Sequence, residues 1–509
     1  MSMKILDCTL RDGGYYTNWD FEPELVKEYL TSVNSLPIEY VEVGYRQPTK
    51  SEYMGEYAYL PMHTIEQCKK CAPNKKLALM LNLKDVDEFS LITLLEPIGN
   101  IVQLIRFATA PEDIKKAAKL ANVVRTLGMK VSVNVMYMST WLSDEKFWQQ
   151  LPLLDDNIDM LCMVDSYGAV YPHEIPQIVA KVKQSISKPI GFHGHDNMTL
   201  AFANALAALH AGCKMIDSTI MGMGRGAGNL RTELLMTYLA KDDIRINLNS
   251  VVELLAHFAP LYEKYGWGTN LPYMISGTNS LPQKDIMAML SQKRYSIAHI
   301  VRHLQNNLSP NKTNQYPEIQ INAKPEPVLL VGGGASVIKH LGAIVAYLNR
   351  NPFIPVCFLS AKHIALFDVI NNPRYICLVG NEGARVERNA DILHETDVFV
   401  LSNNAKHSVT YVPECVKERA YVISASNQFN LYDAPFALAM ELVPNISTAQ
   451  TILLIGMDGY SESKLSDIYD MMRENQTIID AYMGQFHFKS LLPTEYKHIE
   501  QSSIYAELV

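Results

Sequence analysis

The first half of the chain alternates short apolar, β-branched runs with longer segments whose apolar residues recur at helical spacing. One longer segment, 111–127, starts with a proline and has apolar residues three and four positions apart, which predicts a helix. Repetition of such units is typical of parallel βα folds. The pattern predicts eight strands, at 4–10, 38–45, 77–82, 101–108, 130–137, 158–165, 188–195 and 213–220.

Eight βα units in about 240 residues match the size of a closed (β/α)₈ TIM barrel. An open doubly wound sheet would also alternate strands and helices, but it rarely needs eight units. We therefore predict a TIM-barrel catalytic domain over residues 1–240.

The second half of the chain has a different pattern of apolar and polar residues. Helical periodicity predicts a helical extension over 241–310, and a polar stretch with prolines predicts a linker over 311–327. From 328 onwards, apolar runs and helical segments alternate again, which predicts a Rossmann-like α/β domain over 328–509. Its expected elements are a strand starting at 328, a helix at 337–349 and strands at 355–359, 375–379, 397–401, 420–424 and 452–455.

Composition and charge narrow the classes of partner and location. A formal net charge of −8 argues against nucleic acid or an anionic membrane as partner. The N-terminus does not resemble a signal peptide, and no apolar run reaches the roughly 18–20 residues of a membrane span. The only close pair of cysteines, Cys68 and Cys71, lacks a second pair at zinc-site spacing. We therefore expect free thiols and a cytoplasmic protein.

The carboxyl ends of the predicted barrel strands carry ligands of the metal-binding type. Residues two apart on a strand point to one face, so His193 and His195 can bind the same ion. Asp12, after the first predicted strand, completes a set of two histidines and one carboxylate, because barrel closure brings the two strands together. The alternative is an ordinary polar loop. Asn229, after a glycine-rich loop, is a candidate for a further oxygen ligand.

Mixed nitrogen and oxygen ligands leave open positions for water and for a chelating 2-oxo acid. Such a site fits Mn²⁺, which we expect first, as well as Mg²⁺ or Co²⁺. Zinc is less expected without a thiolate. When a carbon–carbon bond breaks or forms beside the ketone, negative charge collects on the keto oxygen as an enolate. The metal and the guanidinium of Arg11 would stabilise that charge, although Arg11 could instead form only a salt bridge with Asp12.

Five motifs resemble the metal-dependent lyase and aldolase superfamily that includes 3-hydroxy-3-methylglutaryl-CoA lyase, isopropylmalate synthase and 4-hydroxy-2-oxovalerate aldolase. They are LDCTLRDGG (6–14), IRFAT (105–109), VDSYGAVYP (164–172), GFHGHDN (191–197) and GMGRGAGNLRTE (222–233). The resemblance implies that Asp12, His193 and His195 bind the metal and that Asn229 often completes the shell. It also implies that Arg11 stabilises the enolate.

Within this superfamily the chain most resembles the aldolase branch. Gly14 stands where the synthases carry an acidic residue, and 222–229 lacks the cysteine of the lyases. Members of the aldolase branch place a catalytic histidine two residues after Arg–Asp–Gly, and this chain has none there. Tyr15, Tyr16 or a metal-bound water is the candidate for proton transfer, with aromatic packing as the alternative for either tyrosine.

Two further groups of residues are candidates for binding. Arg106, Asp165 and Ser166 lie at or near strand ends and are predicted to contact the substrate, a ligand histidine or a neighbouring carboxylate. In the second domain, a glycine turn between a strand and a helix could hold a phosphate or could be only a tight turn. Its residues, Gly332, Gly333 and Gly334, are weak candidates for cofactor binding because no complete nucleotide motif is present.

The favoured function is a divalent-metal-dependent aldolase that cleaves or forms a 4-hydroxy-2-oxo acid from pyruvate, or a close relative, and an aldehyde. We expect a homo-oligomer. One alternative is a Claisen-type enzyme that uses an acyl-CoA. The other is a bifunctional protein of a glycan pathway whose C-terminal domain binds a nucleotide.

Overall fold

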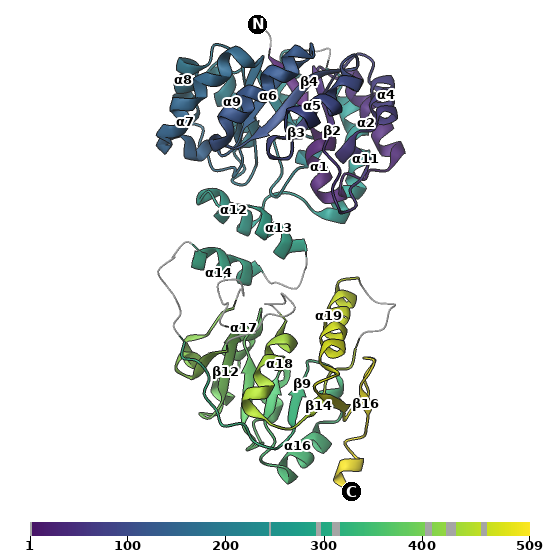
Figure 1. Cartoon of the computed structure of the whole chain (residues 1–509), viewed down its shortest axis with the longest axis vertical. Helices are drawn as coiled ribbons and strands as arrows, with labels where there is room; N and C mark the ends of the chain where they lie inside the picture. The colour runs from purple at the N-terminus through teal and green to yellow at the C-terminus, as the bar shows by residue number, and fades with distance from the viewer. Residues whose placement is uncertain are drawn as a thin grey trace. The chain divides into compact units, whose positions relative to one another are not determined.

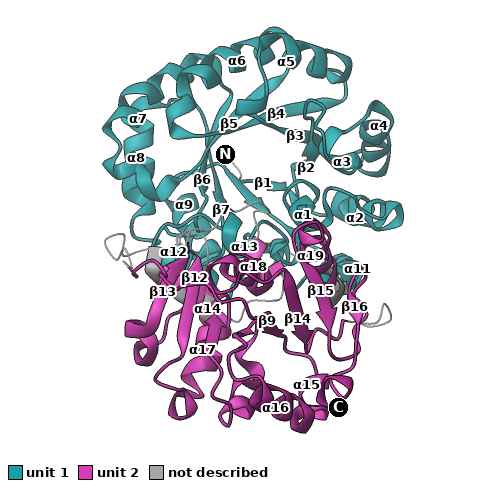
Figure 2. Ribbon diagram, turned by 60° about the horizontal axis from the view of Figure 1, so that its bottom comes forward, with its two compact units in different colours: residues 1–287 teal, residues 288–509 magenta. Residues whose placement is uncertain are grey.

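The computed structural model describes residues 3–243, 246–291, 297–307, 316–402, 410–423, 434–459 and 466–509. Two compact units make up the chain, Met1–Met287 and Ala288–Val509 (Figure 2). Parts of the predicted linker (311–315) and the last residue of the predicted strand at 420–424 lie outside the described residues. No helix in the described ranges combines the length and apolar character needed to cross a membrane.

The first unit is a closed barrel of eight parallel strands, each paired with the next and the eighth paired with the first. Figure 1 labels three of its strands, β2, β3 and β4. This confirms the predicted TIM barrel. The strands are β1 (Lys4–Asp7), β2 (Tyr40–Tyr45), β3 (Lys76–Asn82), β4 (Val102–Thr109), β5 (Lys130–Val135), β6 (Met160–Asp165), β7 (Ile190–Gly194) and β8 (Met215–Ser218).

Helices surround the barrel and bury the outward-facing side chains of the strands in one large apolar core. They include α2 (Pro23–Ser35), α4 (Met62–Cys71), α5 (Glu88–Leu95), α6 (Ile114–Thr126), α8 (Ile175–Ser185), α9 (Ala201–His210), α10 (Thr232–Leu239) and α11 (Leu248–Tyr265). Shorter helices are α3 (Glu56–Tyr59), α7 (Glu145–Gln150) and α12 (Leu271–Thr278), and α13 (Lys284–Ser291) and α14 (Ile297–Asn307) follow.

The inward-facing side chains form layers because alternate residues of a strand face the same side. An apolar layer closes the barrel interior, and it includes Tyr40, Ala78, Leu104, Met160 and Met215. Two residues further along the same strands, the side chains become mostly polar: Glu42, Met80, Arg106, Cys162 and Asp217. The apolar layer therefore supports a polar layer directly beneath the carboxyl end of the barrel.

The first strand is shorter than the sequence predicts. It ends at Asp7, and residues Thr9–Thr17 form helix α1. The Asp7 carboxylate accepts hydrogen bonds from the backbone N–H and the hydroxyl of Thr9, at 3.0 and 2.6 Å, which turns the chain out of the strand. Arg11 and Asp12 consequently lie on the first turns of a helix and not at a strand end.

The second unit contains one eight-stranded parallel sheet in the order β13-β12-β11-β10-β9-β14-β15-β16. Helices α18 (Pro435–Ile446) and α19 (Ser466–Tyr482) pack on one face, and α16 (Leu341–Arg350) packs on the other. The strands are β9 (Val328–Val331), β10 (Val356–Phe358), β11 (Arg374–Cys377), β12 (Val398–Ser402), β13 (Ala420–Ile423), β14 (Thr451–Ile455), β15 (His487–Ser490) and β16 (Glu500–Gln501). The remaining helices are α15 (Ser336–Lys339) and α17 (Glu382–Glu387).

Candidate active site

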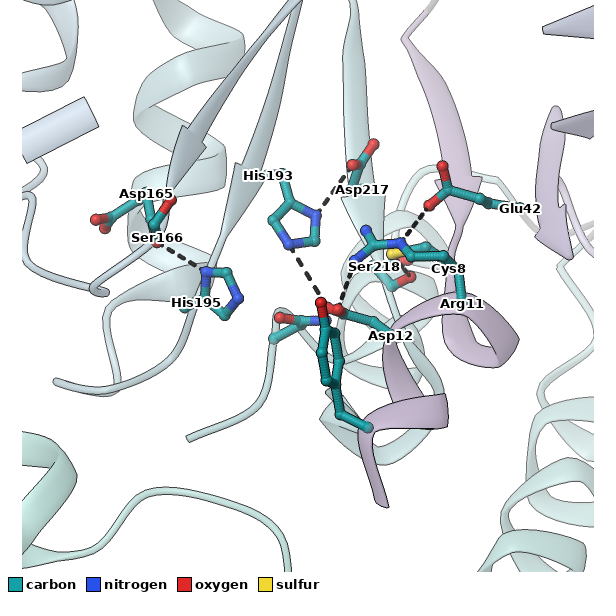
Figure 3. A network of polar contacts seen from close by, with 12 residues as sticks. Cys8, Arg11, Asp12, Glu42, Asp165, Ser166, His193, His195, Asp217 and Ser218 are labelled. Carbon is teal, nitrogen blue, oxygen red and sulfur yellow. Dashed lines mark hydrogen bonds and ion pairs between the residues drawn. The ribbon is translucent and has the colours of Figure 1, made fainter. Parts of the chain in front are cut away.

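The three predicted metal ligands meet at the carboxyl end of the barrel. One ligand atom each from Asp12, His193 and His195 lies within 4.8 Å of the others, and all three side chains are buried. The Nε2 atom of His193 is 3.7 Å from a carboxylate oxygen of Asp12 (Figure 3). Helix α1 and strand β7 thus bring together donors that are far apart in the sequence.

Hydrogen bonds fix both imidazole rings through their Nδ1 atoms. Nδ1 of His193 lies 3.0 Å from a carboxylate oxygen of Asp217, and Nδ1 of His195 lies 2.9 Å from the backbone oxygen of Asp165 (Figure 3). Each ring donates through Nδ1 in this arrangement and keeps the lone pair of Nε2 for an ion. Burial, reinforced by His193, lowers the pKa of His195 to about 4, so this ring is neutral near pH 7.

Asn229 contributes an unused oxygen to the same place. Its side-chain amide donates to the Asp12 carboxylate, while its own Oδ1 atom is buried without a hydrogen-bond partner. The loop that carries it is tightly folded: Gly228 has φ +81°, and a Cβ there would lie 2.3 Å from the Gly222 carbonyl oxygen. Two imidazole nitrogens, a carboxylate and an unpaired amide oxygen suit a divalent ion with mixed nitrogen and oxygen ligands.

Buried charges connect these ligands in a closed ring beneath the cavity. Arg11 pairs with Asp12 at 2.5 Å and with Glu42 at 2.7 Å (Figure 3). Arg106 pairs with Glu42 at 3.3 Å and with Asp217 at 2.6 Å. The contact between Asp217 and the neighbouring imidazole closes the ring. Three carboxylates and two guanidinium groups leave one negative charge, and a divalent ion would change this to one positive charge, which favours an anionic substrate.

The predicted substrate-binding residues occupy three different environments. Arg106 is fully buried in the charge ring and does not line the cavity. The side chain of Asp165 accepts hydrogen bonds from the backbone of Ala169 and Val170, and burial raises its pKa to about 7. Ser166 lines the cavity, and its hydroxyl accepts a hydrogen bond from the backbone of Tyr137 at 2.9 Å.

The two candidate tyrosines of α1 point in different directions. Tyr15 lines the cavity, and its hydroxyl is 3.3 Å from the hydroxyl of Tyr45. Tyr16 does not line the cavity; its hydroxyl donates to the backbone oxygen of Gly226 at 2.9 Å, and burial raises its pKa. Of the two, Tyr15 has the position from which a proton can reach a bound substrate.

The cavity above the ligands measures about 550 Å³. Its wall combines the site residues with polar and aromatic side chains from the loops that follow the strands. Besides the residues already named, the wall contains Met80, Asn82, Lys84, Ala108, Ala110, Glu112, Asp113, Asn134, Met136, Val164, Tyr167, Arg225, Pro282 and Gln283. This volume lies within the range of sites that bind small molecules.

Two members of the charge ring, Glu42 and Asp217, were not predicted from the sequence. Both stand two residues after an inward-facing apolar residue of their strand, Tyr40 and Met215. A charged residue in register with the interior of a barrel strand is the signal that could have identified them.

In the second unit, the glycine turn contacts the loop that follows the neighbouring strand β14. The N–H of Gly334 donates to the Gly456 oxygen at 2.9 Å. The Asp458 carboxylate accepts hydrogen bonds from the backbone N–H, at 2.9 Å, and the hydroxyl of Ser336. The Asp458 carboxylate thus accepts hydrogen bonds from the donors at the start of α15 that a bound phosphate would need.

A closed (β/α)₈ barrel with two histidines and a carboxylate at one end defines a class of metal-dependent barrel enzymes. The chain belongs to the HMGL-like family, whose sequence model matches residues 2–256. The chain is 31% identical over 253 residues to the 4-hydroxy-2-oxovalerate aldolase of Geobacillus thermodenitrificans, with 49% of this chain and 72% of the relative covered. It is 24% identical over 306 residues to the oxaloacetate decarboxylase of Mycobacterium tuberculosis, with 58% of this chain and 89% of the relative covered.

Among solved structures, the N-terminal domain of a Bacteroides vulgatus protein assigned as an aldolase is similar, with 46% identity and a TM-score of 0.56. That match covers 59% of this chain and 99% of the other. The family and these relatives identify the chain as a carbon–carbon lyase of the pyruvate-aldolase type.

Proposed function

We propose that the barrel is a divalent-metal-dependent aldolase that cleaves or forms a 4-hydroxy-2-oxo acid, with pyruvate and an aldehyde as the two fragments. The observation that carries this proposal is the set of Asp12, His193 and His195 beside an arginine that faces the cavity. The aldolase relatives support it. A bound divalent ion would polarise the 2-oxo acid and stabilise negative charge on its keto oxygen. Asp12, His193, His195 and Asn229 would hold that ion, with Mn²⁺ favoured.

The side chains around the ligands have separate tasks in this proposal. Arg11 is held by its two carboxylate partners with its guanidinium at the cavity wall, where it stabilises the developing enolate. Because its position is already fixed, little reorganisation accompanies the reaction. Asp217 and the backbone oxygen of Asp165 keep the two imidazoles in one orientation.

Cleavage requires one proton to move from oxygen to carbon. Tyr15, or a water next to it, relays the proton: its oxygen accepts the proton of the C4 hydroxyl and gives up its own proton as the C3–C4 bond breaks. The bonding electron pair passes into the pyruvate enolate, and the C4 carbon leaves as the aldehyde. Return of the proton to C3 gives pyruvate, and the reverse sequence forms the aldol. Positioned proton transfer of this kind contributes about 10²–10⁴-fold to the rate.

The test is pyruvate release from 4-hydroxy-2-oxo acids of varied chain length, with and without Mn²⁺, by the full-length protein and by Asp12→Asn. We expect pyruvate release to depend on the metal and to be lost in the variant. The asparagine amide has nearly the same shape as the carboxylate but lacks the negative charge that would bind the ion. Oxaloacetate is a second substrate in the same assay, since its decarboxylation passes through the same pyruvate enolate.

Three outcomes are distinct. Release of pyruvate from the hydroxy acids supports the aldolase. Release from oxaloacetate alone would replace it with a decarboxylase, as in the mycobacterial relative. Absence of release from any substrate by the metal-loaded protein would contradict the proposal and favour condensation with an acyl-CoA.

A further inference from the structure

Arg225 is a cation of the cavity wall that has no carboxylate partner among the residues that the structure describes. The guanidinium of Arg11 is engaged by two carboxylates. Lys84 also lines the wall, in the turn after β3, and it too forms no ion pair among the described residues. Arg225 pairs with no carboxylate in the part of the chain that the structure describes; its guanidinium stacks on the Tyr15 ring, 5.4 Å from the ring centre.

The loop that carries Arg225 is firmly anchored. On its C-terminal side, the Gly226 oxygen accepts the hydroxyl of Tyr16 at 2.9 Å. The N–H of Ala227 donates to the side chain of Gln283 at 3.3 Å, and the Gly228 oxygen accepts the N–H of Asp196 at 2.9 Å. Tyr16 thus positions this loop. A half-buried, unpaired arginine on an anchored loop is arranged to receive an anion.

The rest of the wall suits a hydroxylated substrate. Tyr137 and Tyr167 stack with ring centres 5.2 Å apart, and both line the cavity with Asn82 and Asn134. Tyr137 holds a left-handed backbone conformation, with φ 62°, that turns its side chain into this wall. Asn82 and Asn134 already bond to Asp85 and Arg106, whereas the hydroxyls of the two tyrosines can bind polar groups that a short alkyl aldehyde lacks.

Accepting the aldolase proposed above, we infer that the aldehyde substrate carries an anionic group, a carboxylate or a phosphate, and that Arg225 binds this group. Arg225 lies on the loop after β8, opposite the loop after β4 in an eight-stranded barrel. The aldehyde carbon points towards the metal ligands, while its anionic end reaches the arginine stacked on Tyr15. Arg225 is therefore a specificity-determining residue, and the aldol product carries a second acidic group.

The test measures kcat/KM for aldol formation from pyruvate with matched aldehydes. One pair is glyceraldehyde 3-phosphate and glyceraldehyde; the other is succinic semialdehyde and butanal. We expect the kcat/KM of one anionic aldehyde to exceed that of its neutral counterpart by about 10- to 100-fold, which is the range for a hydrogen bond to a charged group. The pair with the larger ratio distinguishes phosphate from carboxylate.

Variants assign this preference to the arginine. Arg225→Gln should raise the KM of the anionic aldehyde by a similar factor and leave the KM of pyruvate nearly unchanged, whereas Arg225→Lys should retain most of the preference. Arg231→Gln removes the same charge at an exposed position outside the cavity and is the matched control. It should leave both KM values as they are.

Two results would overturn the inference. One is equal kcat/KM for charged and neutral aldehydes in an enzyme that forms aldols. The other is a rise in the KM of pyruvate in Arg225→Gln, which would assign the arginine to the carboxylate of the 2-oxo acid. Failure of the aldolase proposal looks different, because then no aldehyde, charged or neutral, reacts with pyruvate.

Discussion

Replacement of Asp217 by asparagine tests the charge ring beneath the active site. One oxygen of this carboxylate receives Arg106 at 2.6 Å and His193 at 3.0 Å, and the other oxygen is buried without a hydrogen-bond partner. The asparagine oxygen can keep both contacts, so the geometry survives. The variant loses the negative charge, and its NH₂ group must occupy the position of the unpartnered oxygen.

Each loss has a known size. Hydrogen bonds to a charged group contribute about 1.5–3 kcal/mol and those between neutral groups about 1 kcal/mol, so the lost charge costs about 0.5–2 kcal/mol. A buried NH₂ group without an acceptor costs about 1–3 kcal/mol more. We expect the free energy of unfolding to fall by about 1.5–5 kcal/mol. We also expect about 10- to 100-fold weaker Mn²⁺ binding, because the carboxylate orients a ligand histidine.

Urea unfolding of the metal-free protein and calorimetric titration with Mn²⁺ measure the two effects separately. Asp159→Asn is the control, because that carboxylate accepts the backbone N–H of Val131 at 2.9 Å and stands just before β6, outside the charge ring. If Asp217→Asn has the same free energy of unfolding and the same affinity for Mn²⁺ as the wild type, the charge ring neither stabilises the barrel nor orients His193.

Three other changes have defined outcomes. Arg374 and Asp397 form a buried ion pair at 2.5 Å in the second unit, so Arg374→Met leaves the Asp397 charge buried without its partner. The free energy of unfolding in urea should fall by about 3–5 kcal/mol, and the double variant Arg374→Met, Asp397→Leu should recover most of that loss. Gly228→Ala strains a left-handed residue against the Gly222 carbonyl, and calorimetry should show weaker Mn²⁺ binding; unchanged affinity would exclude a role for the loop in placing Asn229. Tyr15→Phe keeps the ring under Arg225 but should lower kcat by about 10²–10⁴-fold with little change in KM; an unchanged kcat would exclude Tyr15 from the proton transfer.

Sequence periodicity was enough to predict the barrel, because apolar runs and helical segments alternate eight times. It was not enough at β1, where the apolar character continues past Asp7 and the turn depends on side-chain hydrogen bonds to Thr9. In the second unit, β15 and β16 were missed because their short, polar sequences lack an apolar run, and the predicted helix at 337–349 is divided at His340.

In the site, too, residues that belong to local sequence motifs could be predicted, whereas properties that depend on the three-dimensional arrangement could not. The candidate ligands Asp12, His193 and His195 belong to recognisable motifs, so the sequence alone was enough to select them. Tyr15 and Tyr16 could not be separated from sequence, because successive residues of a helix point about 100° apart and the orientation of α1 decides which one faces the cavity. The unpaired state of Arg225 depends on the positions of every nearby carboxylate, which no local pattern contains.

Hydrogen exchange at the methyl group of pyruvate in D₂O tests the proposed aldolase most directly. Mass spectrometry measures the exchange with Mn²⁺-loaded enzyme and with enzyme whose metal has been removed by a chelator. Enolate formation is the step shared by cleavage and synthesis, and its measurement needs no knowledge of the aldehyde. We predict deuterium incorporation that depends on both enzyme and Mn²⁺ and that Asp12→Asn loses. Mn²⁺-loaded enzyme that leaves the pyruvate methyl group undeuterated would contradict the account.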